Sequence, residues 1–172
     1  LDEVLAALSV AHGAGVLHRD IKPGNVLLTA DGRSMKVADF GIAKSAGAAL
    51  TATGQVIGTM CYMSPERVAG APASVSDDLY AVGLMGYEAL LGHRAFPQDN
   101  PVALARAIMD SPPPPLSSQT GVDPVLAAVI DRAMNRDPRA RFGSAAQMCA
   151  ALAGDVTALT AAAGLPRPAT RV

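Results

Sequence analysis

Residues 18–25 read His-Arg-Asp-Ile-Lys-Pro-Gly-Asn, and residues 39–41 read Asp-Phe-Gly. The first string brings an acid, a base and an amide close together in the chain, and the second begins with another acid. A carboxylate can orient or deprotonate a hydroxyl, an ammonium can bind a phosphate, and carboxylate and amide oxygens suit Mg²⁺. These residue types in this order indicate phosphoryl transfer, which depends on alignment of the reactants and on neutralisation of charge.

The sequence between the two strings predicts a β-hairpin. Residues 26–28 and 35–38 are short strand-like runs, and the Asp-Gly pair at 31–32 is a strong signal for a tight turn. Asn25 and Asp39 then stand at the two open ends of the hairpin. We therefore expect them to lie side by side, close to the acid at position 20.

The rest of the chain is predicted to be mostly helical. Helices are expected from apolar periodicity and from Asn-Pro, Asp-Pro and Ser start signals at residues 2–12, 77–91, 101–109, 124–135 and from Ser144 onward. Residues 42–58 are rich in small residues without a period and predict a mobile loop. From Gly154 the chain becomes rich in alanine and then proline, which is typical of a linker.

Composition bounds the class of protein. The chain has 172 residues, of which 50% are apolar, and a net charge of -1, so one domain is expected and no attraction to nucleic acid. Cys61 and Cys149 form no CxxC pair, which fits a reducing cytoplasm, and no apolar run is long enough to span a membrane. Because Leu1 falls inside a helical pattern, we expect the chain to be a piece of a longer protein.

Three strings together resemble the signatures of one family. Residues 18–20 with Asn25 resemble the catalytic loop of protein kinases, and residues 39–41 resemble their metal-binding triplet. Residues 64–66, Ser-Pro-Glu, resemble the Ala-Pro-Glu that closes the activation segment, with Ser in place of Ala. One triplet is weak evidence, but three in the right order are specific. The chain thus resembles a bacterial, eukaryotic-like (Hanks-type) serine/threonine protein kinase.

The resemblance implies a fold and its boundaries. Residues 1–153 would form the carboxy-terminal lobe of the kinase domain, mainly α-helical with one small β-hairpin, and residues 154–172 would form a tail or linker. The amino-terminal lobe, with its Gly-x-Gly-x-x-Gly loop and phosphate-binding lysine, is absent from these residues. We therefore expect the parent protein to be active and this piece alone to be inactive.

The resemblance assigns the chemistry to five residues. Asp20 would be the base or the group that orients the hydroxyl, and Lys22 would bind the transferring phosphate. Asn25 and Asp39 would bind Mg²⁺, with Mn²⁺ as an alternative ion. Leu27 would lie under the adenine ring of ATP or be an ordinary core leucine. Taken singly, the polar residues could instead be a cap, a turn or solvated surface groups.

Other residues are assigned to regulation. In the family, Lys22 and Thr59 together indicate acceptors on Ser or Thr rather than Tyr. Arg19 could pair with a phosphate on the activation loop and order that loop. Thr51 and Thr53 would be autophosphorylation sites there, or ordinary loop threonines.

A last group is predicted to be structural. His18 is interpreted as a buried structural histidine. Glu66 and Arg141 would form a buried ion pair, and Asp78 would hold the backbone of the catalytic loop from a buried helix. His12, like His93, shows no ligand spacing and receives no role.

These assignments predict transfer of phosphate from ATP to serine or threonine hydroxyls of protein substrates. The expected location is cytoplasmic, with a membrane anchor of the parent beyond residue 172 left open, and the resemblance allows a homodimer for autophosphorylation. One alternative is a truncated kinase-like module that binds or scaffolds without catalysis. A weaker alternative is a metal-binding helical domain of unrelated function.

Overall fold

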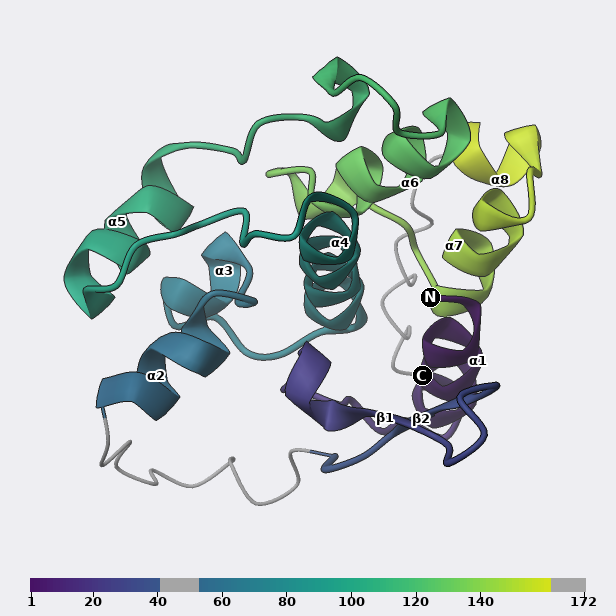
Figure 1. The fold of residues 1–172 in the computed structure, drawn as a ribbon, viewed down its shortest axis with the longest axis horizontal. Coiled ribbons are helices and arrows are strands. Elements are labelled where there is room, and N and C mark those ends of the chain that lie inside the picture. The colour runs from purple at the N-terminus through teal and green to yellow at the C-terminus, as the bar shows by residue number, and fades with distance from the viewer. Residues whose placement is uncertain (41–52, 162–172) are drawn as a thin grey trace, which may run out of the picture.

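The computed structural model describes residues 1–40 and 53–161. These residues form a mainly helical fold with a two-stranded antiparallel sheet, as predicted (Figure 1). The elements of the described residues are α1 (Asp2–Gly13), η1 (Pro23–Asn25), β1 (Val26–Leu28), β2 (Met35–Val37), α2 (Thr53–Met60), α3 (Pro65–Val68), α4 (Val75–Leu91), α5 (Pro101–Asp110), η3 (Leu116–Ser118), α6 (Pro124–Ala133), η4 (Pro138–Ala140), α7 (Ala145–Leu152) and α8 (Val156–Thr160). None of the helices in the described ranges combines the length and apolarity that crossing a membrane requires.

Helix α4 lies at the centre of the fold. Figure 1 shows α1, α6, α7 and α8 on one side of it and α2, α3 and α5 on the other. Its residues from Asp78 to Tyr87 are all buried, in agreement with a sequence that is apolar nearly all round. The helix begins at Val75, two residues before the predicted start, because Ser74 and Asp77 form a reciprocal capping box. It ends at Gly92, whose left-handed φ of 72° forms the cap.

The predicted hairpin is confirmed. Strands β1 and β2 pair with Val26 opposite Val37, and the Asp-Gly turn sits between them with Gly32 at a φ of 66°. Beyond the paired strands, the Ala38 N–H donates to the Asn25 carbonyl at 2.8 Å. The hairpin therefore brings the backbone at both ends to one place.

The remaining helices follow their predicted caps. Asn100, Asp123 and Ser144 each accept backbone N–H bonds at the starts of α5, α6 and α7. Helix α6 ends at Ala133, two residues before the predicted end. The chain leaves the helix there, and the carbonyl of Asn135 accepts a hydrogen bond from Arg141 Nε at 2.6 Å.

The structure corrects the predicted loop over residues 42–58. Residues 53–58 belong to helix α2, so the prediction is wrong for them. Ile57 and Met60 pack partly buried against the core, and α2 lies against α5. Burial against a neighbouring helix thus outweighs a composition that is poor in helix formers.

A helix also lies within the stretch that the sequence predicted as a tail. Helix α8 packs on α7, and Arg132 of α6 donates to the carbonyls of Ala158 and Leu159 at 3.0 and 2.5 Å. The Arg132 guanidinium also lies 4.2 Å from the centre of the Phe142 ring. Packing therefore continues beyond residue 153.

Candidate active site

Two side chains, those of Lys22 and Asn25, contact the carboxylate of Asp20, which is 8% exposed. Lys22 Nζ lies 3.0 Å from Asp20 Oδ2 and donates to Thr59 Oγ1, also at 3.0 Å. Asn25 Nδ2 donates to Asp20 Oδ2 at 3.1 Å and to the Asp20 carbonyl at 2.7 Å. An ammonium and an amide are thus both directed at one carboxylate oxygen of Asp20.

Asp78 of α4 binds the backbone of the loop that carries Asp20. Asp78 is 2% exposed and accepts from the backbone N–H groups of His18 and Arg19, each at 2.8 Å. His12 Nε2 contacts the same carboxylate at 2.8 Å. Arg19 takes a left-handed φ of 69°, which is costly for a residue with a side chain, and the two bonds to Asp78 hold it there.

The Asp-Phe-Gly strand end meets this loop through its backbone and an aromatic ring. His18 is fully buried, its Nε2 lies 3.0 Å from the carbonyl of Ala38, and its ring centre lies 4.6 Å from that of Phe40. Asp39 is exposed and has a left-handed φ of 56°. Its neighbour Ala38 bonds both to Asn25 and to His18, so the backbone of Asp39 lies beside the loop of Asp20.

The predicted ion pair is present. Arg141 is fully buried, and its Nη2 donates to both carboxylate oxygens of Glu66, at 3.0 and 2.9 Å. The side chain of Glu66 keeps 29% of its surface exposed, so the pair is buried on one side only. Arg141 also donates to Ser76 and stacks 4.6 Å from the centre of the Tyr80 ring. This network ties α3 to the start of α4 and to the loop after α6.

Tyr62, in the segment before α3, is anchored on α4. Its hydroxyl donates to the carboxylate of Glu88. Burial, and secondly this hydrogen bond, raise the pKa of Tyr62 well above its usual value of 10. The phenol is therefore a fixed neutral donor at working pH.

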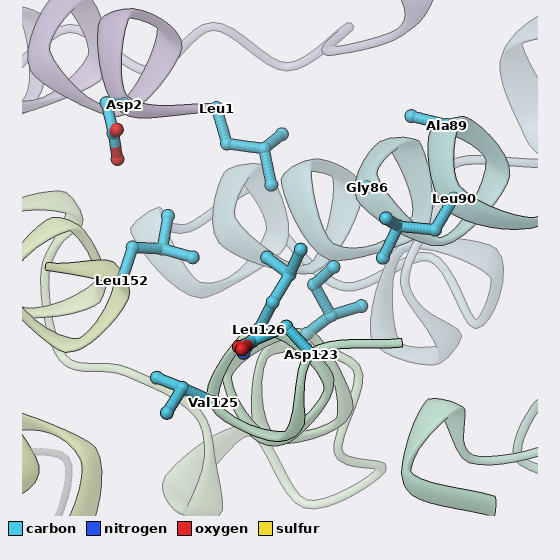
Figure 2. Close-up of a pocket in the computed structure, with 10 residues that line it drawn as sticks. Leu1, Asp2, Gly86, Ala89, Leu90, Asp123, Val125, Leu126 and Leu152 are labelled. Carbon is cyan, nitrogen blue, oxygen red and sulfur yellow. The ribbon is translucent and has the colours of Figure 1, made fainter. Parts of the chain in front are cut away.

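A cavity of about 390 Å³ lies elsewhere, between α1, α4, α6 and α7 (Figure 2). Figure 2 shows mainly aliphatic side chains around it, among them Leu90, Leu126 and Leu152. Its lining includes none of the residues around Asp20. The polar cluster at Asp20 and this apolar cavity are separate features.

Comparison with known proteins agrees with the geometry. The family described as "Protein kinase domain" matches residues 1–152. The chain belongs to the protein kinase family. It is 40% identical over 169 residues to "Serine/threonine-protein kinase PknA" of Mycobacterium tuberculosis (strain ATCC 25618 / H37Rv), covering 98% of this chain and 38% of that kinase.

Other bacterial kinases are similar as well. "Serine/threonine-protein kinase PknL" of the same strain is 40% identical over 154 residues, covering 88% of this chain and 38% of that protein. "Serine/threonine-protein kinases PknA" of Corynebacterium glutamicum is 40% identical over 153 residues, covering 88% of this chain and 32% of that protein. The resemblance to bacterial Hanks-type serine/threonine kinases is thus confirmed. The chain spans less than two fifths of the length of these kinases.

Protein kinases generally use ATP and Mg²⁺, and two residues of this kinase chain fit a magnesium ion. Both described bonds of the Asn25 side chain are made by its amide nitrogen, and its amide oxygen is an acceptor of the kind that magnesium binds. Asp39 supplies an exposed carboxylate from the adjoining strand end. In residues 1–40 and 53–161 no cluster of three or more His, Cys, Asp or Glu residues could hold a metal. Magnesium needs none, because it retains waters and binds substrate phosphates.

Some predicted site residues of the kinase chain do not contact Asp20, Lys22 or Asn25 in any described bond. Thr51 lies outside the described residues, and Thr53 is the first residue of α2. Leu27 is 54% exposed on β1 and is not part of the core of the described residues. Arg19 is exposed.

Sequence reasoning missed His12 and Tyr62. His12 received no role, yet it contacts Asp78, which lies 66 positions away. Its position on the last turn of α1, just before the catalytic loop, was the available signal, but the partner could not be seen. Tyr62 carries no motif of its own, and its bond to Glu88 depends on how α4 packs.

Proposed function

We propose that this chain is the carboxy-terminal lobe of a kinase catalytic domain whose parent protein transfers phosphate from ATP to serine and threonine hydroxyls of proteins. The observation that carries the proposal is the position of Lys22 Nζ, 3.0 Å from Asp20 Oδ2 and 3.0 Å from Thr59 Oγ1. An acid, a cation and the segment after the second motif meet there, as phosphoryl transfer to a hydroxyl requires.

The residues divide the work as follows. Asp20 orients the acceptor hydroxyl and takes its proton as the oxygen bonds to the γ-phosphorus, while the bond from that phosphorus to the departing ADP oxygen breaks. Lys22 offsets the charge of the phosphate in transfer. Asn25 and Asp39 would hold magnesium, which neutralises phosphate charge when it is bound. Leu27, exposed on β1, offers an apolar surface to the adenine ring.

Regulation and location are part of the same proposal. Arg19 would pair with phosphate on Thr51 or Thr53, and two copies of the kinase would meet for this autophosphorylation. The catalytic domain would work in the cytoplasm. Residues 1–172 contain no Gly-x-Gly-x-x-Gly sequence, so we expect them not to transfer phosphate by themselves.

The test is phosphate transfer by the intact gene product that contains this chain, with magnesium-ATP and a basic model protein. Asp20→Ala and Asp39→Ala should each lower the rate by a factor on the order of 10² or more while circular dichroism stays unchanged. Asp110→Ala, on the exposed surface of α5, is the matched control and should keep the wild-type rate. Phosphate should appear on Ser and Thr, not on Tyr.

Two results would overturn the proposal. Full activity of Asp39→Ala would remove the metal assignment. A folded wild-type protein without any transfer would favour the alternative of a binding or scaffold module.

A further inference from the structure

Asp77 and Asp78 are adjacent acids in the first turn of α4, and they hold two different segments. Asp78 holds the loop of Asp20 through the N–H groups of His18 and Arg19. Asp77 Oδ1 accepts a 2.5 Å hydrogen bond from the hydroxyl of Ser64. Neighbouring residues on a helix point about 100° apart. One helical turn therefore contacts both the catalytic loop and the segment that ends at Ser64.

Ser64 is fully buried, and its hydroxyl is used twice. It donates to Asp77 and accepts from the backbone N–H of Arg67 at 3.2 Å, which caps α3. An alanine, the residue of the family signature at this position, could make neither bond. The serine in this chain thus adds a connection from the end of the segment to α4.

The second carboxylate oxygen of Asp77, Oδ2, bonds only to Ser74, three residues away, among the described contacts. Asp77 Oδ2 accepts from the N–H and the hydroxyl of Ser74, both at 2.7 Å, and these bonds belong to the capping box of α4. Ser74 is exposed and precedes the helix. The two oxygens of one carboxylate can therefore be tested separately, one for the contact between segments and one for the helix cap.

The segment that Ser64 closes also contacts the catalytic residues. Thr59 accepts from Lys22, and Tyr62 donates to Glu88. A cavity of about 30 Å³ lies between this segment and the catalytic loop, and Asp77 and Asp78 are among the residues that line it. Its walls include Asp20, Thr59, Tyr62, Ser64, Asp77 and Asp78.

We infer that Ser64 and Asp77 are positioning residues that fix the segment from Thr59 to Ser64 against the catalytic loop, and that they determine how well a protein acceptor is aligned. The inference rests on the proposed kinase function. Residues 59–64 lie where the acceptor would meet Asp20, and the pair holds the far end of that segment, as Lys22 holds its near end. Removing the bond between Ser64 and Asp77 should weaken alignment of the acceptor and leave ATP binding unchanged.

The test compares Ser64→Ala with Ser74→Ala in the intact gene product. Ser64→Ala should raise the KM for the protein acceptor about tenfold, as expected for one lost buried hydrogen bond. The KM for ATP and the slow hydrolysis of ATP without acceptor should not change. Ser74→Ala, which removes the hydroxyl bond of Ser74 to Asp77 but not the bond from its backbone N–H, should leave the acceptor KM unchanged. In a double-mutant cycle, Ser64→Ala should raise the acceptor KM no further once Asp77 is alanine, because the remaining bond of Ser64 only caps α3.

Hydrogen exchange gives a readout that does not depend on catalysis. Ser64→Ala should speed exchange in residues 59–64 but not in residues 17–22, whereas Ser74→Ala should change neither. An unchanged acceptor KM together with unchanged exchange would overturn the inference. If the wild-type protein transfers no phosphate, the proposed function fails. Faster exchange in Ser64→Ala would then keep the contact but overturn its link to the acceptor.

Discussion

Replacement of Asp78 by Asn is the sharpest test of how α4 supports the site. The Asp78 carboxylate is 2% exposed and has three neighbouring nitrogens at 2.8 Å. Oδ1 accepts from the N–H of Arg19, and Oδ2 accepts from the N–H of His18 and contacts His12 Nε2. Asn has nearly the same size, so the change replaces one oxygen by an NH₂ group and removes the charge without leaving a cavity.

Neither orientation of the new amide satisfies all three neighbours. With the NH₂ group at the former Oδ1, it faces the N–H of Arg19. With the NH₂ group at the former Oδ2, it faces the N–H of His18 and the ring of His12. At least one backbone N–H loses its acceptor away from water, which costs about 1–3 kcal/mol, and the remaining bond loses its charged acceptor. We expect the free energy of unfolding to fall by about 2–4 kcal/mol.

Denaturant unfolding of the purified protein measures this change. Asp110→Asn is the matched control because it also neutralises a helical aspartate, but one that is exposed and paired with Arg106 on the surface. Its effect should stay below about 0.5 kcal/mol. If Asp78→Asn were as mild as the control, the three contacts would not hold the catalytic loop and the reasoning would be refuted.

Two further predictions concern the network around Arg141. Glu66→Ala leaves the fully buried Arg141 guanidinium without its carboxylate. The free energy of unfolding should fall by about 3 kcal/mol, the lower end for a broken buried pair, because Glu66 is 29% exposed. A fall of less than about 1 kcal/mol in denaturant unfolding would contradict this. Burial raises the pKa of Tyr80 to about 12 from 10, so the unfolded chain ionises first and stability falls as the pH rises above 10. Above pH 10 the free energy of unfolding should fall less steeply in Tyr80→Phe than in wild type, by up to about 1.4 kcal/mol per pH unit. Measuring the unfolding free energy of both proteins at about pH 9 and about pH 11 tests this. Identical slopes for Tyr80→Phe and wild type would contradict it.

Features set by neighbouring residues could be predicted from the sequence. The Asp-Gly turn needs only a left-handed Gly32 and two short apolar runs, and the caps at Asn100, Asp123 and Ser144 each bind N–H groups within three residues. The contacts of Asp20 with Lys22 and Asn25 are of the same kind, because all three residues lie on one short loop. In these cases the partners are close in sequence, so the pattern contains the contact.

The family resemblance supplied two distant contacts, Glu66 with Arg141 and Asp78 with the catalytic loop. Other features set by distant packing could not be predicted. The composition of α2 predicts a loop, and the helix is stabilised by burial against α5, which lies far along the chain. The His12 contact with Asp78 spans 66 positions, and the Ser64 contact with Asp77 depends on the angle between α3 and α4. A single sequence shows which of these residues are polar but not which of them meet.

Two residues of the site, Arg19 and Asp39, have left-handed backbone conformations that the sequence motif alone does not explain. Arg19 and Asp39 have φ values of 69° and 56°, and such conformations cost on the order of 1–3 kcal/mol each in non-glycine residues. Without tertiary contacts, both residues would prefer a negative φ. The bonds of Asp78 to the loop hold Arg19, and the bonds of Ala38 to Asn25 and His18 hold the strand end before Asp39. The motif thus specifies which groups are present, but buried partners on α4 and in the hairpin impose the backbone that aims them. Substitutions at those partners should therefore disturb the site even though they leave every motif residue intact.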